Sequence, residues 1–71
     1  MTDPAMGLAS VGDAVRGARR ERRWSQTQLG DAAGVSRPTI ARIERGDDVS
    51  VGTLVKVTAA VGLTVKIEAA Q

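Results

Sequence analysis

Between residues 25 and 46, apolar residues repeat at helical spacing in two short runs: Leu29, Ala32 and Ala33, then Ile40 and Ile43. Ser25 and Ser36 precede the two runs and are suited to cap a helix start. Gly34 lies between the runs and Gly46 follows the second one. Glycine readily adopts the positive φ angles that end helices. The pattern therefore predicts two short helices joined by a tight turn.

A further helix is predicted on each side of this pair. The earlier one covers residues 11–22, with an apolar stripe of Val11, Val15 and Ala18. Ser10 and Asp13 resemble a capping box at its start, whereas Gly12 and Gly17 are poor helix formers, so packing must hold it. The later helix covers residues 51–61, begins after Ser50 and ends before Gly62. Its core stripe consists of Leu54, Val57 and Val61.

After Gly62 the period changes, because residues 63–68 alternate apolar and polar side chains as a strand does. The chain offers no second strand, and a single strand is not stable alone. We expect it to pair antiparallel with the same strand of a second copy, centred on Val65. Leu63, Val65 and Ile67 would then form a shared apolar face. The expected organisation is a flexible segment 1–7, a helical domain 8–62, a dimerisation strand 63–68 and a tail 69–71.

The composition of this 71-residue chain narrows its function. A domain of this size buries only about 60% of its unfolded surface, so a partner subunit would help. The sequence has no Cys and no His, which removes the usual metal ligands and the groups that activate a nucleophile. We expect no enzyme activity, metal or cofactor. No signal peptide or membrane span is recognisable, so a cytoplasmic location is expected.

The charges are unevenly distributed. Residues 16–45 contain eight Arg and three acidic residues, a net charge of +5, whereas the remaining residues carry a net charge of −3. An Arg-rich stretch can simply be a solvated surface. Here it coincides with the predicted helix pair, which favours a polyanion, and specifically nucleic acid, as the partner.

The second helix of the pair offers side chains suited to read base edges. If Ile40 faces inward, Pro38, Arg42 and Arg45 face outward and Ala41 lies on a flank. Pro38 disfavours helical torsions in the residue before it, so the helix is expected to begin at Pro38, with Arg37 projecting from its first turn. The predicted base-reading residues are Arg37, Pro38, Ala41 and Arg42. Arginine matches the two acceptors of guanine, while proline and alanine offer shape and contact with thymine methyl groups.

A second set is suited to bind phosphates: Gln26, Ser36, Thr39, Arg45, Arg22 and Arg23. Gln26 begins a helix, where free N–H groups and the helix dipole attract anions. Ser36 can act as a cap as well as a phosphate ligand. Arg22 and Arg23 are as easily explained by solvation. Trp24 precedes the Ser25 cap and is expected to pack as a hydrophobic staple; stacking on a base is the alternative.

The motif SQ..L...AGVS..TI.RIE.G over residues 25–46 resembles the Cro and lambda-repressor type of helix-turn-helix, the xenobiotic-response-element family. The resemblance implies a mainly α fold of four to five helices that binds double-stranded DNA. The family usually has Ala where this chain has Gly30. In the family, an Arg of the first helix pairs with a Glu near the end of the recognition helix, which implies a structural ion pair between Arg19 and Glu44.

Three features resemble HipB-type antitoxins within that family: the RRWSQ stretch, the short distance from the last helix to the chain end, and the alternating GLTVKIE tail. That resemblance implies a homodimeric repressor that binds a palindromic operator, represses its own operon and binds a kinase-like toxin. Two alternatives stay open. One is a stand-alone phage or chromosomal repressor, and the other is an interaction module that does not bind DNA.

Overall fold

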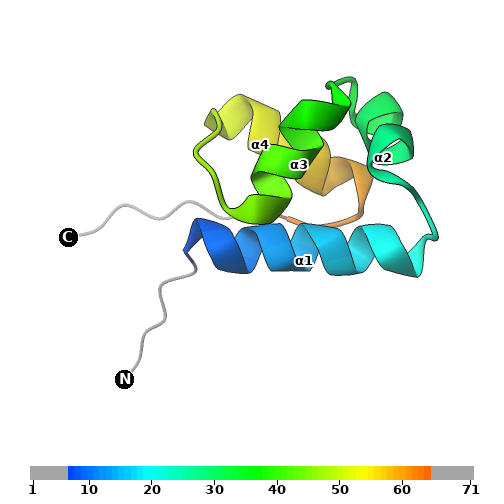
Figure 1. The fold of residues 1–71 in the computed structure, drawn as a ribbon, viewed down its shortest axis with the longest axis horizontal. Helices are drawn as coiled ribbons and strands as arrows, with labels where there is room; N and C mark the ends of the chain where they lie inside the picture. Colours follow the sequence, from blue (N-terminus) through cyan, green and yellow to red (C-terminus); the bar gives the residue numbers. More distant parts are fainter. Residues whose placement is uncertain (1–6, 65–71) are drawn as a thin grey trace.

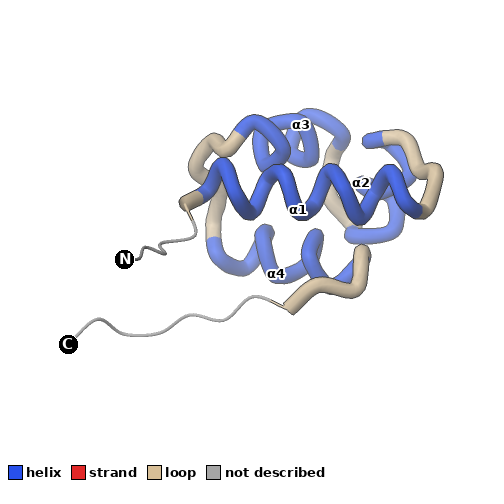
Figure 2. The backbone as a smooth tube through the Cα atoms, turned by 90° about the horizontal axis from the view of Figure 1, so that it is seen from below, coloured by secondary structure: helices blue, strands red, loops and turns tan. Residues whose placement is uncertain are grey.

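The computed structural model describes residues 7–64, which form four helices. The helices are α1 (Leu8–Glu21), α2 (Gln26–Ala33), α3 (Arg37–Arg45) and α4 (Val51–Ala60). α1 runs along one side of the other three (Figure 1), and from below α3 and α4 lie on opposite sides of it (Figure 2). α3 packs against both α1 and α2, and α2 packs against α4. The predicted mainly α fold is confirmed.

One core joins the four helices. Its buried members are Val15, Leu29, Ile40, Ile43, Leu54, Val57 and Val61. All seven belong to the apolar stripes that the sequence predicts, so the helical period located the core correctly. Trp24 and Val35 are half-buried and pack against this cluster. The predicted packing role of Trp24 is therefore supported by its contact with the core.

Serine caps fix the starts of three helices. Ser25 accepts a hydrogen bond from the Gln28 backbone N–H at 3.0 Å, and its own N–H donates to the Gln28 side chain at 2.7 Å. This reciprocal pair is a capping box. Ser36 and Ser50 cap α3 and α4 in the simpler way. α3 begins at Arg37, one residue earlier than expected, because the Ser36 cap fixes the first turn and Pro38 fits there without needing its N–H.

The prediction for the start of α1 was wrong. The helix begins at Leu8, with Gly7 as the N-cap and no side-chain capping bond. The Gly7 carbonyl accepts from the N–H groups of Ser10 and Val11, so Ser10 already lies inside the first turn. Asp13 contacts Arg16 at 3.4 Å instead of capping the helix. The apolar residues before Ser10 extend the helix by one turn.

Three of the four helices are followed by a glycine in the left-handed conformation, and α1 is followed by an arginine instead. Gly34, Gly46 and Gly62 have φ angles of 74°, 85° and 77°. After α1, the left-handed position is taken by Arg23, with a φ of 58°, and the Trp24 N–H donates to the Arg19 carbonyl at 3.2 Å. A side chain at such an angle is strained relative to glycine. The sequence pattern gave no sign of this turn.

Two other glycines allow backbones to come close. A Cβ on Gly12 would clash with the carbonyl oxygen of Ile43, so its absence lets α1 approach α3. A Cβ on Gly30 would lie 2.7 Å from the carbonyl oxygen of Val35, in the turn between α2 and α3. Gly30, where the resembled family usually has Ala, therefore matches an unusually close turn.

The start of the predicted strand packs on the domain. Leu63 is half-buried against the core, and its N–H donates to the Thr58 carbonyl at 2.8 Å. Leu63 and Thr64 have no strand geometry, and no strand occurs among residues 7–64. Val65 and Ile67 lie outside the described residues, as does the segment 1–6, so the dimer strand stays a prediction. No helix within the described part of the chain has the length and apolarity to cross a bilayer.

Candidate nucleic-acid interface

The turn between α2 and α3 fixes how α3 is presented. Gly34 ends α2 in the left-handed conformation, and the Val35 N–H donates back to the Gly30 carbonyl at 2.9 Å. Val35 packs toward the core and Ser36 then starts α3. α3 buries Ile40 and Ile43 against its neighbours. Its opposite face is therefore left free for a ligand.

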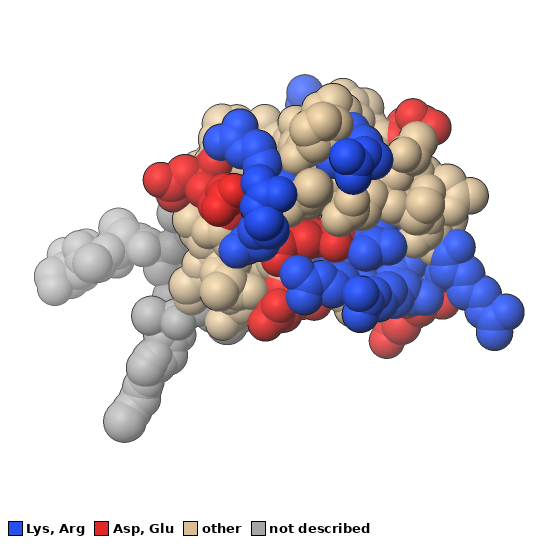
Figure 3. Space-filling model, in the orientation of Figure 1, with Lys and Arg blue, Asp and Glu red and all other residues tan. Residues whose placement is uncertain are grey.

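The free face of α3 carries the predicted base-reading residues. Arg37, Pro38 and Arg42 are exposed, and Ala41 is half-buried on the flank. In the space-filling view, basic side chains gather over α3 and along α1 on the same side of the molecule (Figure 3). Guanidinium groups only donate hydrogen bonds, so this side of the molecule is suited to acceptors and negative charge.

Two of the arginines of α3 already have contacts in the loop before α4. The Arg42 guanidinium donates to the Asp48 carbonyl at 3.0 Å. The Arg45 guanidinium pairs with the Asp47 carboxylate at 2.9 Å. All three side chains of these contacts are exposed, so water weakens both interactions. A phosphate or a base edge can replace them at little cost.

The predicted phosphate ligands Ser36 and Thr39 bond to each other. Their hydroxyl oxygens lie 2.9 Å apart, and the Ser36 hydroxyl also accepts from the Thr39 N–H at 3.3 Å. The capping role of Ser36 is therefore present in the structure. A hydroxyl that accepts one bond can still donate another, so capping leaves Ser36 able to bind a phosphate oxygen.

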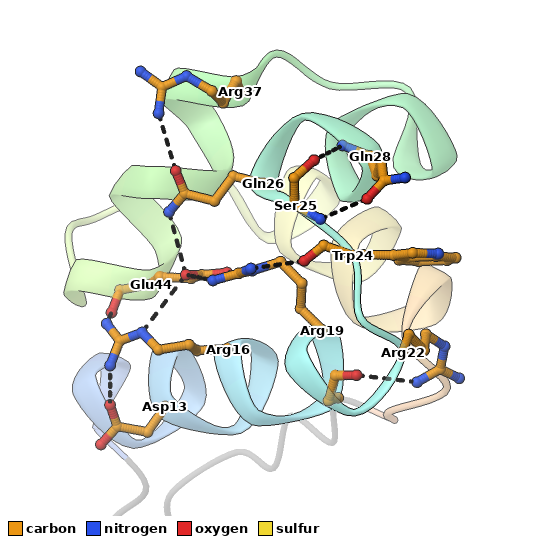
Figure 4. A network of polar contacts seen from close by, with 11 residues as sticks. Asp13, Arg16, Arg19, Arg22, Trp24, Ser25, Gln26, Gln28, Arg37 and Glu44 are labelled. Atoms are coloured by element: carbon orange, nitrogen blue, oxygen red, sulfur yellow. Dashed lines mark hydrogen bonds and ion pairs between the residues drawn. The ribbon is translucent and has the colours of Figure 1, made fainter.

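Arg22 and Arg23 lie at the end of α1, next to the start of α2. The Arg22 guanidinium lies 5.7 Å from the centre of the Trp24 ring, within the range of a cation–π contact. Arg23 is exposed. The Arg22 guanidinium also lies beside Gly62, at the end of α4, and Figure 4 shows it away from Gln26. The structure therefore does not bring Arg22 together with Gln26.

Beneath the interface lies the ion pair that the resemblance implied. Arg19 donates from Nε to Glu44 Oε2 at 2.6 Å and from Nη2 to Glu44 Oε1 at 3.0 Å. The two side chains are 11% and 2% exposed. Arg19 also donates to the Trp24 carbonyl at 2.8 Å, which ties α1, α3 and the loop before α2 together.

The charge of Glu44 is stabilised in spite of its burial. Burial alone would raise the pKa of this carboxyl group, but hydrogen bonds from Arg19 and Gln26 and the charges of Arg19 and Arg16 outweigh it. The pKa of Glu44 therefore lies below its ordinary value of 4.5. Mainly through the hydrogen bond to Glu44, the pKa of Arg19 is raised. Glu44 is thus ionised at neutral pH.

The sequence reasoning missed Arg16 and assigned Gln26 only to phosphate binding. Arg16 donates to the Glu44 backbone carbonyl at 2.7 Å, and its Nε lies 3.6 Å from Glu44 Oε1. Its spacing from Arg19, three residues on one helix, was the available signal. Gln26 donates from Nε2 to Glu44 Oε1 at 3.3 Å, and its Oε1 accepts from Arg37 at 3.0 Å. Figure 4 shows the resulting connected network.

Comparison with known proteins agrees with this geometry. A family model described as helix-turn-helix (HTH_3), the Cro and lambda-repressor type, matches residues 15–67. The chain belongs to this helix-turn-helix family. Its fold is that of DNA-binding regulators, and no enzyme activity is associated with it. No curated protein sequence matches the chain significantly.

Several solved structures resemble the whole domain. The clp gene regulator ClgR from Corynebacterium glutamicum is 29% identical, with a TM-score of 0.72 over 90% of this chain and 82% of that chain. HipB in the HipA-HipB-O2-O3 complex is 18% identical, with a TM-score of 0.77 over 99% of this chain and 100% of that chain. A HipB variant in complex with an O2 20mer is 19% identical, with a TM-score of 0.78 over the full length of both chains.

Proposed function

We propose that this protein is a homodimeric transcriptional repressor that reads a palindromic operator, and that it is the antitoxin of a HipBA-like toxin–antitoxin operon. The observation that supports sequence-specific binding is the outer face of α3. Arg37, Pro38 and Arg42 are exposed together there. The buried residues Ile40, Ile43 and Glu44 hold this helix in place. Two arginines on one such helix can each recognise a guanine.

The roles proposed for single residues follow their positions. Arg37, Pro38, Ala41 and Arg42 would meet base edges. Gln26, Ser36, Thr39, Arg45, Arg22 and Arg23 would contact phosphates around the groove. Phosphate contacts set the register of the helix, and base contacts select the sequence. The two groups therefore differ in what their loss should do, except at Gln26, whose amide also accepts from the base-reading Arg37 at 3.0 Å.

Replacing Arg37 or Arg42 by Ala tests the assignment. Each change should weaken cognate binding by about 1–3 kcal/mol and relax discrimination at one or two base pairs. Thr39→Val, which removes a proposed phosphate ligand, should weaken binding to all duplexes by a similar factor. The measurement is titration of each variant on a selected cognate duplex and a scrambled one. Equal losses on both duplexes for the arginine variants would contradict base reading.

The antitoxin role is supported by similarity of fold to HipB. The HipB chains cover 99–100% of this chain and 100% of their own length. ClgR favours the second candidate, a gene regulator without a toxin, since it is more identical in sequence. We favour the antitoxin because the RRWSQ and GLTVKIE stretches both resemble HipB-type antitoxins.

Co-purification distinguishes the two candidates. The neighbouring reading frame of the operon, expressed with an affinity tag, should retain this protein through salt washes if it encodes a kinase-like toxin. A version of the neighbouring protein denatured before mixing serves as the control. Failure to retain the repressor, together with normal operator binding, would leave the stand-alone regulator as the function.

A further inference from the structure

Gln26 links a buried carboxylate to an arginine on the DNA-binding face. Its Nε2 donates to Glu44 Oε1 at 3.3 Å, and its Oε1 accepts from Arg37 Nη1 at 3.0 Å. Glu44 is 2% exposed and lies near the end of α3, whereas Arg37 is exposed at the start of the same helix. Figure 4 shows the amide of Gln26 between the two groups.

The chemistry of the neighbours leaves this amide one orientation. An ionised carboxylate can only accept hydrogen bonds, so Gln26 must turn its NH2 group toward Glu44. A guanidinium can only donate, so it requires the amide oxygen. Both neighbours therefore select the same orientation of an amide group that would otherwise be free to flip.

The fixed amide holds Arg37 in advance of binding. Arginine loses much rotamer freedom when it is immobilised in an interface, and that loss weakens binding. Here one amino group of Arg37 is tied to Gln26, while the other N–H groups of the guanidinium remain able to reach a guanine. The arginine therefore arrives at the groove already partly ordered.

We propose that Glu44 is a positioning residue for base recognition: through the Gln26 amide, it holds Arg37 in the conformation that reads its base pair. The proposal rests on the base-reading role given to Arg37 above. It makes the specificity of the repressor depend on a carboxylate that DNA does not touch, since Glu44 is enclosed by α1, α2 and α3. The Glu44–Arg19 pair then supports both the fold and the readout.

The test separates positioning from stability by measuring discrimination rather than affinity. The Arg37→Ala variant first identifies the base pair at which discrimination is lost. For each further variant, affinity is measured on the cognate duplex and on a duplex changed at that base pair, and the ratio of the two affinities is the discrimination ratio. Gln26→Met breaks the relay and leaves the Glu44–Arg19 pair intact. Glu44→Gln leaves one acceptor oxygen where the carboxylate had two. Both variants should lower the discrimination ratio by about 2- to 10-fold at that base pair. Discrimination at the base pair read by Arg42 should not change.

A matched control lies two residues along the same helix. Gln28 belongs to the capping box and touches neither Glu44 nor Arg37, so Gln28→Met should leave the ratio unchanged while it slightly destabilises α2. In the Arg37→Ala background, Gln26→Met should bring no further loss of discrimination. In the DNA-free protein, NMR relaxation of the Arg37 Nε–H group should show greater motion in Gln26→Met than in the wild type.

The outcomes distinguish failure of the positioning role from failure of the proposed function. An unchanged ratio in Gln26→Met, in a wild type that discriminates its cognate duplex, overturns the positioning role and leaves the proposed function standing. A wild type that does not discriminate between duplexes overturns both. If Glu44→Gln does not fold, Gln26→Glu gives the decision, because its carboxylate still accepts from Arg37 but cannot donate to Glu44. A lowered ratio in that variant supports the role of Glu44, and an unchanged ratio overturns it.

Discussion

At the scale of single residues, Arg23 shows a local conflict between side chain and backbone. It takes the left-handed position after α1 with a φ of 58°, where glycine stands after the other three helices. Such an angle costs a side-chain-bearing residue about 1–2 kcal/mol. The proposed phosphate contact would give the charge of this arginine a role.

Arg23→Gly should therefore stabilise the domain while it removes a charge from the interface. Relief of the left-handed strain is opposed by the greater freedom of glycine in the unfolded chain, about 0.5–1 kcal/mol. The expected net gain in the free energy of unfolding is about 0.5–1 kcal/mol, measured by urea denaturation. Arg23→Ala keeps the Cβ and loses the charge, so an equal gain in that variant would assign the effect to charge instead of backbone strain.

The ionised Glu44 should make the free energy of unfolding decrease at acidic pH. Its pKa is lower in the folded protein than in the unfolded chain. The stabilisation is therefore fully present above the unfolded pKa and is lost as pH falls through the folded pKa. The free energy of unfolding should decrease as pH falls below the ordinary glutamate pKa of 4.5, and less steeply in Glu44→Gln than in the wild type. Parallel pH profiles for the two proteins would contradict this role.

At the scale of elements, the contact between α1 and α3 depends on one glycine. Gly12 faces the carbonyl oxygens of Ile43 and Glu44, whereas a Cβ on Gly17 would meet no atom within 4 Å. Both lie inside α1, where alanine is the better helix former by about 0.5–1 kcal/mol. Helix propensity alone would thus predict the same gain at both positions.

Packing should make the two substitutions differ in sign. Gly17→Ala should raise the free energy of unfolding by about 0.5–1 kcal/mol, and Gly12→Ala should lower it by about 1–3 kcal/mol, because the clash forces α1 away from α3. Chemical denaturation of the pair measures both. A gain in Gly12→Ala would mean that the helices can separate without loss.

The sequence predicted best the helix ends that are set by residues close in the sequence. α2 was predicted with the correct bounds, because Ser25 and Gly34 fix its ends within the same short stretch. The prediction of the start of α1 was wrong because Ser10 and Asp13 resemble a capping box, although the helix already begins before them at Leu8. The contacts of Arg16 and Gln26 with Glu44 join residues 28 and 18 positions apart. Such contacts depend on how three helices pack, which no local pattern records.

At the scale of the whole molecule, the proposed dimer and the monomer fold can be tested separately. Leu63 packs on the core and is hydrogen-bonded to Thr58, so removing it would also disturb the monomer. Removing residues 65–71 avoids this. The shortened protein should keep its helical circular dichroism, sediment as a monomer at low micromolar concentration and bind a full palindrome no better than a half-site. A dimer that binds the palindrome normally would contradict the strand hypothesis.

The contact between Arg45 and Asp47 has a consequence for ion release. The affinity of proteins for DNA falls with salt because each neutralised phosphate frees a condensed cation. Arg45 is already paired with a carboxylate at 2.9 Å, so a phosphate that takes its place leaves Asp47 to attract a cation from solution. One ion is released and another is taken up. The slope of log affinity against log salt should therefore correspond to about one phosphate fewer than the number that the arginines contact. Asp47→Asn should make this slope steeper by about one phosphate.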